Sequence, residues 1–491
     1  MPDIDLDVTA HEHATRLRAG DYSARALAEA TLVRVRAQEP ALNAYITLTE
    51  ERALAQAEAA DVRLRAGDGG PLTGVPIAVK DLLCTSGVRT TAGSHMLETF
   101  VPFYDATVVE RLDAAGAVTV GKTNLDEFAM GSSTEFSAFG PTHNPWALDR
   151  VPGGSSGGSA ATVAARGVPL AIGTDTGGSI RQPAALCGIL GLKPTYGRVS
   201  RFGVVAFASS LEQVGPFGRD AEDVARLLGV IAGPDERDAT TAPLPVPDYT
   251  ADFGRGLAGL RVGVPQQFLE RGLGPGVREA VEEAIGVFER EGAIVDRRVT
   301  LPSADAALAV YYLIAPSEAS ANLARYDGVK YGFSFRDGSS VEEEMAETRS
   351  RGFGSEVKRR IMLGTYALSA GYYDAYYLKA QKVRTTITRE FEAAFADHDL
   401  ILTPTAPTTA FRLGEKLADP YAMYLNDLFT IPANIGGNPA ISVPCGFAEG
   451  LPVGLHLIAP HFREGVLLRA AHAYGSLTDW HTRRPHGIPA S

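Results

Sequence analysis

The chain contains Gly153-Gly154-Ser155-Ser156-Gly157-Gly158-Ser159 and, shortly after it, Gly173-Thr174-Asp175-Thr176-Gly177-Gly178-Ser179-Ile180-Arg181. Between these two stretches, residues 160–165 favour a helix and residues 168–172 favour a strand. Glycine pairs directly before a serine let the main chain approach a reacting carbonyl and aim successive N–H groups at one point, which is how an oxyanion is held. A pair of flexible loops is the alternative, but such loops do not need two hydroxyl clusters flanked by apolar segments. The pattern therefore favours a catalytic site that uses serine.

Before and after these two stretches, short runs of β-branched residues alternate with helical segments. This alternation predicts an α/β fold. Residues 9–66 carry apolar residues at helical spacing, so we expect residues 1–70 to be a helical lead-in packed on a domain of residues 71–491. Residues 242–249 are rich in proline and are expected to form a connecting loop. The other expected strands are 74–80, 117–120, 260–264, 293–295, 399–403 and 451–458, and the other expected helices are 106–115, 277–291, 355–396 and 465–474.

The composition is that of a globular protein, with 491 residues of which 45% are hydrophobic and 21% are charged. The net charge of −12 has the wrong sign for a chain that grips phosphate backbones by itself, which disfavours direct nucleic-acid binding. The three cysteines are too few and too far apart for a disulfide framework or a zinc knuckle, and we expect no metal. Residues 1–7 lack the features of a signal peptide and no stretch approaches 18 apolar residues, so we expect a cytoplasmic protein without membrane contact.

Two matches to catalytic motifs do not fit their structural context. Residues 116–123 satisfy the phosphate-loop pattern, whose mechanism requires a strand, then a loop, then a helix. Here a helical segment precedes Gly116 and the variable positions are strand-like, which indicates a helix-to-strand turn. Residues 153–157 match the G-x-S-x-G elbow of α/β-hydrolases, but residues 144–152 hold two prolines and no apolar run, so no strand leads into it.

A nucleophilic serine needs a base. Nothing local pairs His398, His456 or His461 with an acid, which makes a Ser-His-Asp hydrolase the weaker interpretation. The remaining candidate is a lysine kept neutral by burial, since burial disfavours the ammonium form and lowers the lysine pKa. Lys80 ends the apolar run of residues 75–79, where a buried lysine is expected, although a single lysine is more often a solvated surface charge.

Together with Gly74-Val75-Pro76-Ile77-Ala78-Val79-Lys80-Asp81, the two serine stretches resemble the amidase signature family. The order and spacing of Lys80, Ser155 and Ser179 also agree with that family. The resemblance implies that Ser179 is the acyl-forming nucleophile, that Ser155 is a bridging hydroxyl and that Lys80 is the base. It also implies the fold of the family, a central mixed β-sheet covered by helices on both faces.

The resemblance further implies how the surroundings of the nucleophile are built. A cis peptide bond is implied between Gly154 and Ser155. Asp175 and Arg181 are expected to brace their loop as an ion pair rather than to contact substrate. The oxyanion hole would be lined by the N–H groups of Thr176, Gly177, Gly178 and Ser179.

Within the family, residues 121–133, 193–203, 356–365 and 424–432 resemble the glutaminase subunits of tRNA-dependent amidotransferases. Free glutamine is a zwitterion, so its site needs a cation for the α-carboxylate and an anion for the α-amino group. The resemblance implies Arg360 and Asp427 as that pair, with the neighbouring Arg359 as an alternative to Arg360. The alternative interpretation is that these arginines are only surface charges of a helix. Either Tyr311 or Tyr312 would also line the glutamine pocket.

The same resemblance implies the partners. The chain would hydrolyse glutamine in a heterotrimer with B and C subunits and supply ammonia for the conversion of Glu-tRNA(Gln) to Gln-tRNA(Gln). The tRNA contacts, ATP and Mg would belong mainly to the partner, so no cofactor is expected in this chain. A free-standing Ser-Ser-Lys amidase acting on another small amide is the alternative function. A non-catalytic scaffold is disfavoured because all three triad positions are chemically competent.

Overall fold

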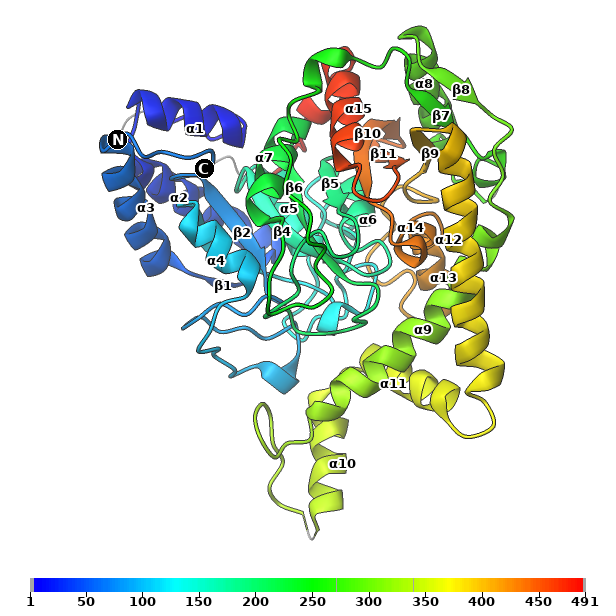
Figure 1. The fold of residues 1–491 in the computed structure, drawn as a ribbon. Coiled ribbons are helices and arrows are strands. Elements are labelled where there is room, and N and C mark those ends of the chain that lie inside the picture. Colours follow the sequence, from blue (N-terminus) through cyan, green and yellow to red (C-terminus); the bar gives the residue numbers. More distant parts are fainter. Residues whose placement is uncertain (1–3, 271, 339, 489–491) are drawn as a thin grey trace.

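One large β-sheet crosses the molecule (Figure 1). The structure is a computed structural model that describes residues 4–270, 272–338 and 340–488. Within these ranges the strands lie side by side in the order β1-β3-β2-β4-β6-β5-β10-β11-β9-β7-β8. Their bounds are β1 Tyr45–Leu48, β2 Pro76–Lys80, β3 Val118–Thr123, β4 Leu170–Asp175, β5 Leu190–Lys193, β6 Gln213–Gly218, β7 Arg261–Gly263, β8 Ile294–Asp296, β9 Leu400–Pro404, β10 Ala440–Ala448 and β11 Leu451–Ile458.

The sheet combines parallel and antiparallel pairs. β2 is parallel to both of its neighbours, β3 and β4, and β7 is parallel to β8 and β9. The pairs from β4 through β6, β5, β10 and β11 to β9 are antiparallel. Every residue of β2, β4 and β6 is buried, so both faces of the sheet are covered there. These observations confirm the predicted α/β class with a mixed central sheet.

The helices pack around this sheet and extend beyond it in the lobe that carries α10 (Figure 1). Their bounds are α1 Ala10–Ala19, α2 Ala24–Leu42, α3 Glu50–Arg65, α4 Thr107–Ala114, α5 Gly157–Ala164, α6 Arg181–Cys187, α7 Ala221–Ile231, α8 Val277–Arg290, α9 Ala307–Asn322, α10 Val341–Gly352, α11 Ser355–Leu368, α12 Lys379–Asp397, α13 Pro420–Tyr424, α14 Ile431–Gly436 and α15 Glu464–Leu477.

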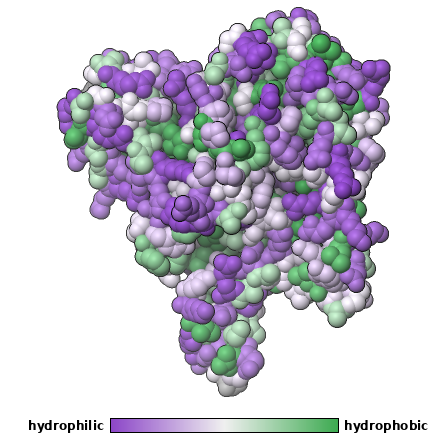
Figure 2. Space-filling model, viewed as in Figure 1, coloured by the Kyte–Doolittle hydropathy of each residue, from purple (hydrophilic) through white to green (hydrophobic). Residues whose placement is uncertain are grey.

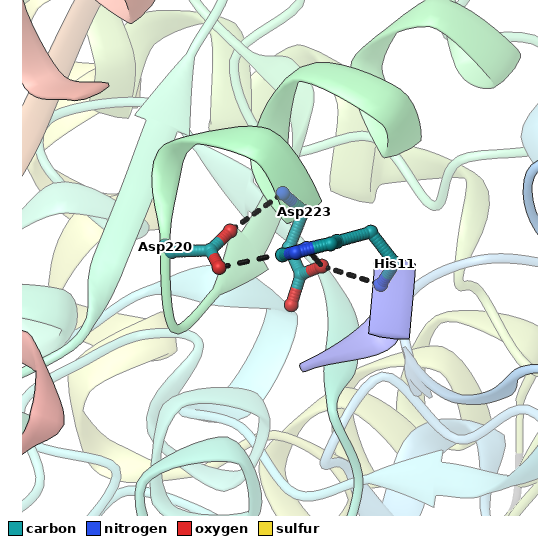
Figure 3. A group of neighbouring side chains, drawn as sticks. All are labelled: His11, Asp220 and Asp223. Carbon is teal, nitrogen blue, oxygen red and sulfur yellow. Dashed lines mark hydrogen bonds and ion pairs between the residues drawn. The ribbon is translucent and has the colours of Figure 1, made fainter. Parts of the chain in front are cut away.

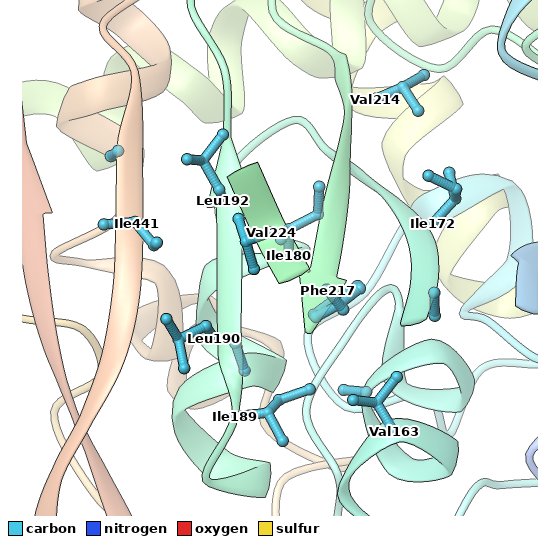
Figure 4. Close-up of a cluster of buried hydrophobic side chains, with 14 of the residues drawn as sticks. Val163, Ile172, Ile180, Ile189, Leu190, Leu192, Val214, Phe217, Val224 and Ile441 are labelled. Carbon is cyan, nitrogen blue, oxygen red and sulfur yellow. The ribbon is translucent and has the colours of Figure 1, made fainter. Parts of the chain in front are cut away.

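A buried hydrophobic cluster fastens three helical segments to the middle of the sheet (Figure 4). Val163 comes from α5, Ile180 stands directly before α6, and Val224 comes from α7. They meet strand residues that include Ile172 of β4 and Phe217 of β6. Full burial of one such side chain contributes about 1.5–3 kcal/mol. The cluster therefore fixes α5 and α6, which begin within the two serine stretches, firmly against the sheet.

The register of β2 and β4 decides where the catalytic candidates meet. Val79 of β2 lies beside Ile172 of β4, and the two strands run in the same direction. Their carboxyl ends therefore lie at one edge of the sheet, where α/β folds place their sites. Lys80 is the last residue of β2 and Asp175 is the last residue of β4. The lysine and the second serine stretch are thus neighbours at this edge.

The structure corrects the sequence prediction at two segments. Residues 45–48 form β1 within the stretch predicted to be helical, because this short run of aromatic and β-branched residues pairs with the edge of β3. Residues 355–396 are not one continuous helical stretch: α11 ends at Leu368, and a π-helical turn, Asp374–Leu378, leads into α12. Gly371 between them has a φ of +86°, a conformation that glycine adopts without steric cost.

Other predictions are confirmed. Gly116 lies between α4 and β3 with a φ of +78°, so the phosphate-loop match is a helix-to-strand turn. No strand leads into Gly153, and residues 242–249 form neither helix nor strand. The expected strands near 74–80, 117–120, 260–264, 293–295, 399–403 and 451–458 all occur.

The face of the molecule seen in Figure 2 carries mainly hydrophilic residues, with smaller hydrophobic patches between them. None of the helices formed by the described residues has the length and apolar character that crossing a membrane requires.

Candidate active site

Lys80 is the last residue of β2, and its amine is surrounded by hydroxyl groups. Its side chain is completely buried. Its Nζ lies 2.8 Å from the hydroxyl oxygens of Ser155, Ser156 and Thr174. Ser156 Oγ also donates to the Thr174 carbonyl at 3.0 Å, so the Ser156 hydroxyl proton is engaged there and this oxygen accepts from Lys80. The amine is thereby held in a fixed position next to Ser155.

Burial lowers the pKa of Lys80 from its ordinary 10.5 to about 7. The carboxylates of Asp126 and Asp175 oppose this effect only in part. No carboxylate of the described residues forms an ion pair with Lys80. A substantial fraction of the amine is therefore neutral near pH 7 and has a lone pair that can accept a proton.

Asp126 organises the first serine stretch. Its carboxylate accepts hydrogen bonds from the N–H groups of Ser133, Thr134 and Phe136, and its own N–H donates to the Ser155 carbonyl at 3.2 Å. The peptide bond between Gly154 and Ser155 is cis, as the family resemblance implied. A Cβ added to Gly154 would lie 2.2 Å from Asp126 Oδ2, so only glycine fits at this position.

The second serine stretch joins the first directly. The Ser156 N–H donates to the Ser179 carbonyl at 3.2 Å, which places Ser179 beside the Lys80 network. Ser179 is 7% exposed and stands two residues before α6. No acceptor among the described residues takes a hydrogen bond from the N–H groups of Thr176, Gly177, Gly178 and Ser179. Four free donors in one tight turn can hold an oxyanion.

The ion pair of Asp175 and Arg181 braces this turn, as predicted. Both side chains are fully buried, and two nearly parallel bonds of 2.9 and 3.0 Å join them. Burial raises the pKa of Asp175, but Arg181 and the hydrogen bonds outweigh it and hold the pKa well below its ordinary range. The Asp175 carboxylate also accepts from the Ile180 N–H, so the pair acts on the backbone of the turn.

A carboxylate faces the same turn from the far side. Asp427 accepts a hydrogen bond from the Ser132 hydroxyl through Oδ2, and its Oδ1 is buried without a hydrogen-bond partner. A Cβ built on Gly178 would lie 3.2 Å from that Oδ1 and 2.2 Å from Thr430 Oγ1. Burial raises the pKa of Asp427 to about 7. An unpaired buried oxygen at this place is suited to a cationic group of a bound molecule.

Arg360 supplies positive charge near Asp427. Its Nε donates to Glu356 Oε1 at 2.8 Å, and its guanidinium lies 5.3 Å from the ring centre of Tyr312 and 5.4 Å from that of Tyr424. Arg359 is bonded to the same Glu356, but its side chain is 40% exposed, whereas that of Arg360 is 3% exposed. Two arginines share one carboxylate, which leaves a net positive charge.

Tyr311 and Tyr312 lie close to these groups, Tyr311 beside Gly177 and Tyr312 beside Arg360. A Cβ on Gly177 would lie 2.9 Å from the Tyr311 ring, so this ring packs against the oxyanion turn. Tyr312 stacks on Tyr424 with 3.9 Å between ring centres, and its hydroxyl is buried without a partner.

Several residues of the site were not predicted as functional. Ser156 and Thr174 contact Lys80 but were not singled out, although both belong to the two serine stretches. Ser132 bonds to Asp427, Glu356 to Arg360, and Thr430 to the Gly177 carbonyl. All three lie within the stretches 121–133, 356–365 and 424–432 that carry the resemblance, but they were not singled out there. The histidines have other partners: His456 contacts Arg181, His398 lies near Asp296, and His461 contacts the Gly436 carbonyl.

Comparison with known proteins agrees with this geometry. A family model described as Amidase matches residues 26–468. The A subunit of glutamyl-tRNA(Gln) amidotransferase from Chloroflexus aggregans is 58% identical over 472 residues, which is 96% of either chain. The crystal structure of the Thermotoga maritima protein of the same name superposes with a TM-score of 0.80 and 45% identity, covering 96% of this chain and 95% of that one. The native peptide amidase of Stenotrophomonas maltophilia superposes with a TM-score of 0.83 and 33% identity over 98% of both chains. The predicted resemblance is therefore confirmed, and the chain belongs to the amidase family.

Proposed function

We propose that this chain is the glutaminase subunit of a tRNA-dependent amidotransferase. One observation carries the proposal: a buried lysine amine is held by hydroxyl groups of the two serine stretches, and near Gly178 of the second stretch the unpaired oxygen of Asp427 and the guanidinium of Arg360 offer opposite charges. Such a site suits the carboxamide of a zwitterionic amino acid. The high identity to relatives named as A subunits of this amidotransferase supports the same function.

The first half of the reaction forms an acyl-enzyme. The Ser179 hydroxyl attacks the side-chain carboxamide carbon of glutamine and gives its proton to Ser155, whose own proton passes to the neutral Nζ of Lys80. The carbonyl oxygen becomes an oxyanion and accepts hydrogen bonds from the free N–H groups of residues 176–179. Collapse breaks the C–N bond, and the leaving nitrogen takes the proton back along the same path and departs as ammonia.

The second half repeats these steps with water. Water attacks the ester carbonyl of the glutamyl-Ser179 intermediate and transfers a proton toward Lys80 through Ser155. Cleavage of the ester returns a proton to the Ser179 oxygen and releases glutamate. Lys80 is neutral again, so no net proton is left on the triad.

In this proposal, glutamine is recognised through its α-ammonium and α-carboxylate groups. Asp427 Oδ1 accepts from the α-ammonium group, and Arg360 binds the α-carboxylate. Arg360 is preferred to Arg359 because its side chain is 3% exposed and lies beside the tyrosines, whereas the side chain of Arg359 is 40% exposed. Tyr311 packs against Gly177 and Tyr312 has an unpaired buried hydroxyl, so in this proposal both tyrosines face the bound glutamine.

Asp427→Asn is expected to raise the KM for glutamine by about 10- to 100-fold, because the variant loses a charge-assisted hydrogen bond to the α-ammonium group. Asparagine keeps the volume of the side chain and an acceptor for the Ser132 hydroxyl. A simple aliphatic amide, which has no α-ammonium group, should lose much less. Steady-state ammonia release with both substrates measures the difference, and equal losses on both would favour a different amide as the substrate.

The proposal includes partners. B and C subunits complete the complex, and the B subunit carries most tRNA contacts together with ATP and Mg, which accords with the net charge of −12 on this chain. The complex acts in the cytoplasm on Glu-tRNA(Gln). Co-expression with candidate B and C subunits, followed by an amidation assay with glutamine as nitrogen donor, tests this directly. We expect a stable heterotrimer that forms Gln-tRNA(Gln) only when glutamine, ATP and Mg are all present.

A free-standing amidase is the second candidate, because the solved peptide amidase shares this fold over 98% of both chains. That function predicts full turnover of simple amides by the isolated chain and no gain from B and C subunits. A marked rise in glutaminase activity upon assembly would exclude it.

A further inference from the structure

A second cluster of reactive side chains lies where α1 meets the beginning of α7 (Figure 3). His11 belongs to α1, Asp220 is the N-cap residue of α7, and Asp223 lies in the first turn of α7. Because β6 is antiparallel to β4, its carboxyl end, which leads to Asp220, lies at the opposite edge of the sheet from Asp175. The proposed reaction uses none of these three side chains.

The backbone orients each carboxylate toward the imidazole. Asp220 Oδ1 caps α7 by accepting the Asp223 N–H at 2.8 Å, and Asp220 Oδ2 lies 3.6 Å from His11 Nδ1. Asp223 is fully buried and accepts the N–H groups of Ala10 and His11 at 2.9 Å each. Its Oδ1 lies 3.0 Å from His11 Nδ1. Hydrogen bonds of this kind hold metal ligands in place in proteins.

The spacing of the donor atoms suits a tetrahedral metal ion. With ligand bonds of about 2.0–2.2 Å, the ligands of tetrahedral zinc lie about 3.3–3.6 Å from one another. The two separations from His11 Nδ1, 3.0 and 3.6 Å, lie just below that range and at its upper end, and all three donor atoms lie within 4.8 Å of one another. A cavity of about 240 Å³, lined by His11, Asp220 and His472 among others, adjoins the cluster and has room for a water ligand.

We propose that His11, Asp220 and Asp223 bind one divalent ion of the zinc class and thereby join the N-terminal helix α1 to α7. One imidazole nitrogen and two carboxylate oxygens are the donor types that such ions accept in proteins. This inference is independent of the proposed function, because the site lies at the other edge of the sheet.

Proton and metal compete for the same imidazole nitrogen. Burial lowers the pKa of His11, but the hydrogen bond to Asp223 and the nearby carboxylates of Asp220 and Glu222 outweigh it and raise the pKa to about 9. His13, Arg219 and His472 are further titratable groups that interact with this cluster. Binding of an ion through His11 Nδ1 would replace the 3.0 Å contact between this nitrogen and Asp223 Oδ1.

Titration of the full chain with ZnCl₂ after removal of metals by a chelator tests the proposal. Calorimetry at pH 7 should show saturable binding of one Zn²⁺ per chain. Bound Zn²⁺ should raise the Tm of the wild-type chain, since it binds only the folded state. His11→Asn keeps an N–H donor toward Asp223 and should weaken Zn²⁺ binding by more than about tenfold.

His95→Asn is the matched control. His95 contacts Glu98 at 3.0 Å on the surface, so it shares the histidine-carboxylate contact, but no second carboxylate of the described residues forms an ion pair with it. This variant should bind Zn²⁺ like the wild type. Equal Zn²⁺ binding by wild type and His11→Asn would overturn the proposal, as would a wild-type chain that shows no saturable binding. Asp220→Asn provides a second ligand variant, with the same expected loss, should His11→Asn fold poorly.

Discussion

Ser179→Ala is expected to lower kcat for glutamine hydrolysis by about 10⁴- to 10⁶-fold, because the variant has no oxygen to form the acyl-enzyme. The fold should persist. Ser179 is 7% exposed, and removal of one hydroxyl creates no large cavity, so we expect the free energy of unfolding to change by about 1 kcal/mol or less. Ammonia release and thermal unfolding, measured on the same preparation, separate loss of chemistry from loss of structure.

Ser159→Ala is the appropriate control for this variant. Ser159 belongs to the first serine stretch and is buried, but its hydroxyl bonds to Thr123 and to the Ile172 carbonyl rather than to Lys80. We expect a modest loss of stability and nearly normal turnover. Substantial glutaminase activity in Ser179→Ala would contradict the assignment of the nucleophile.

Lys80→Met is expected to reduce kcat by about 10² to 10⁴, the usual contribution of a general base. Methionine is apolar and similar in length, so it suits the buried position. In the wild type, kcat/KM for a simple aliphatic amide should rise with pH through a pKa near 7, as Lys80 loses its proton. This substrate has no α-ammonium group, so the titration of Asp427 has little influence on its profile. The profile of the residual activity in Lys80→Met should lack that step.

The same lysine makes stability depend on pH. Its pKa is about 7 in the folded state and 10.5 ordinarily, so the unfolded chain binds more protons between these values. The contribution of Lys80 to the free energy of unfolding therefore rises with pH across this window. Denaturant unfolding of wild type and Lys80→Met at pH 7 and pH 9.5 should show the wild type gaining relative to the variant as pH rises.

Lys193→Met separates the loss of the base from the loss of a buried amine. Lys193 is also buried, its pKa is also lowered to about 7, and its Nζ donates to the Pro194 carbonyl rather than to a serine. This variant should show a similar change in the pH dependence of stability but keep most of its activity. A loss of activity as large as that of Lys80→Met would weaken the assignment of Lys80 as the base.

Local sequence predicted much of the fold because the signals are short-range. Alternating β-branched runs and helical segments marked β2, β3, β4, β9 and β11. It failed at β1, where pairing with the edge of β3 outweighs a helical neighbourhood, and in the stretch 355–396, where a turn at Gly371 separates two helices. The pairing of two strands and the reversal of the chain between two helices depend on contacts with segments that are distant in the sequence. The periodicity of a local stretch therefore does not predict them.

The sequence by itself determined which functional groups are available for catalysis and binding. These are two glycine-rich serine stretches, a lysine at the end of an apolar run, and Arg360 and Asp427, which the family resemblance indicated. Only the tertiary structure decided that Lys80 is completely buried and hydrogen-bonded to three hydroxyl groups. It also decided that Asp427 Oδ1 has no hydrogen-bond partner, and that His11 contacts two aspartates more than 200 residues away in the sequence. The reason is physical. Residue types and spacing follow from the chain, whereas desolvation and the distance between charges arise when distant segments pack together, and these set the pKa values on which the site depends.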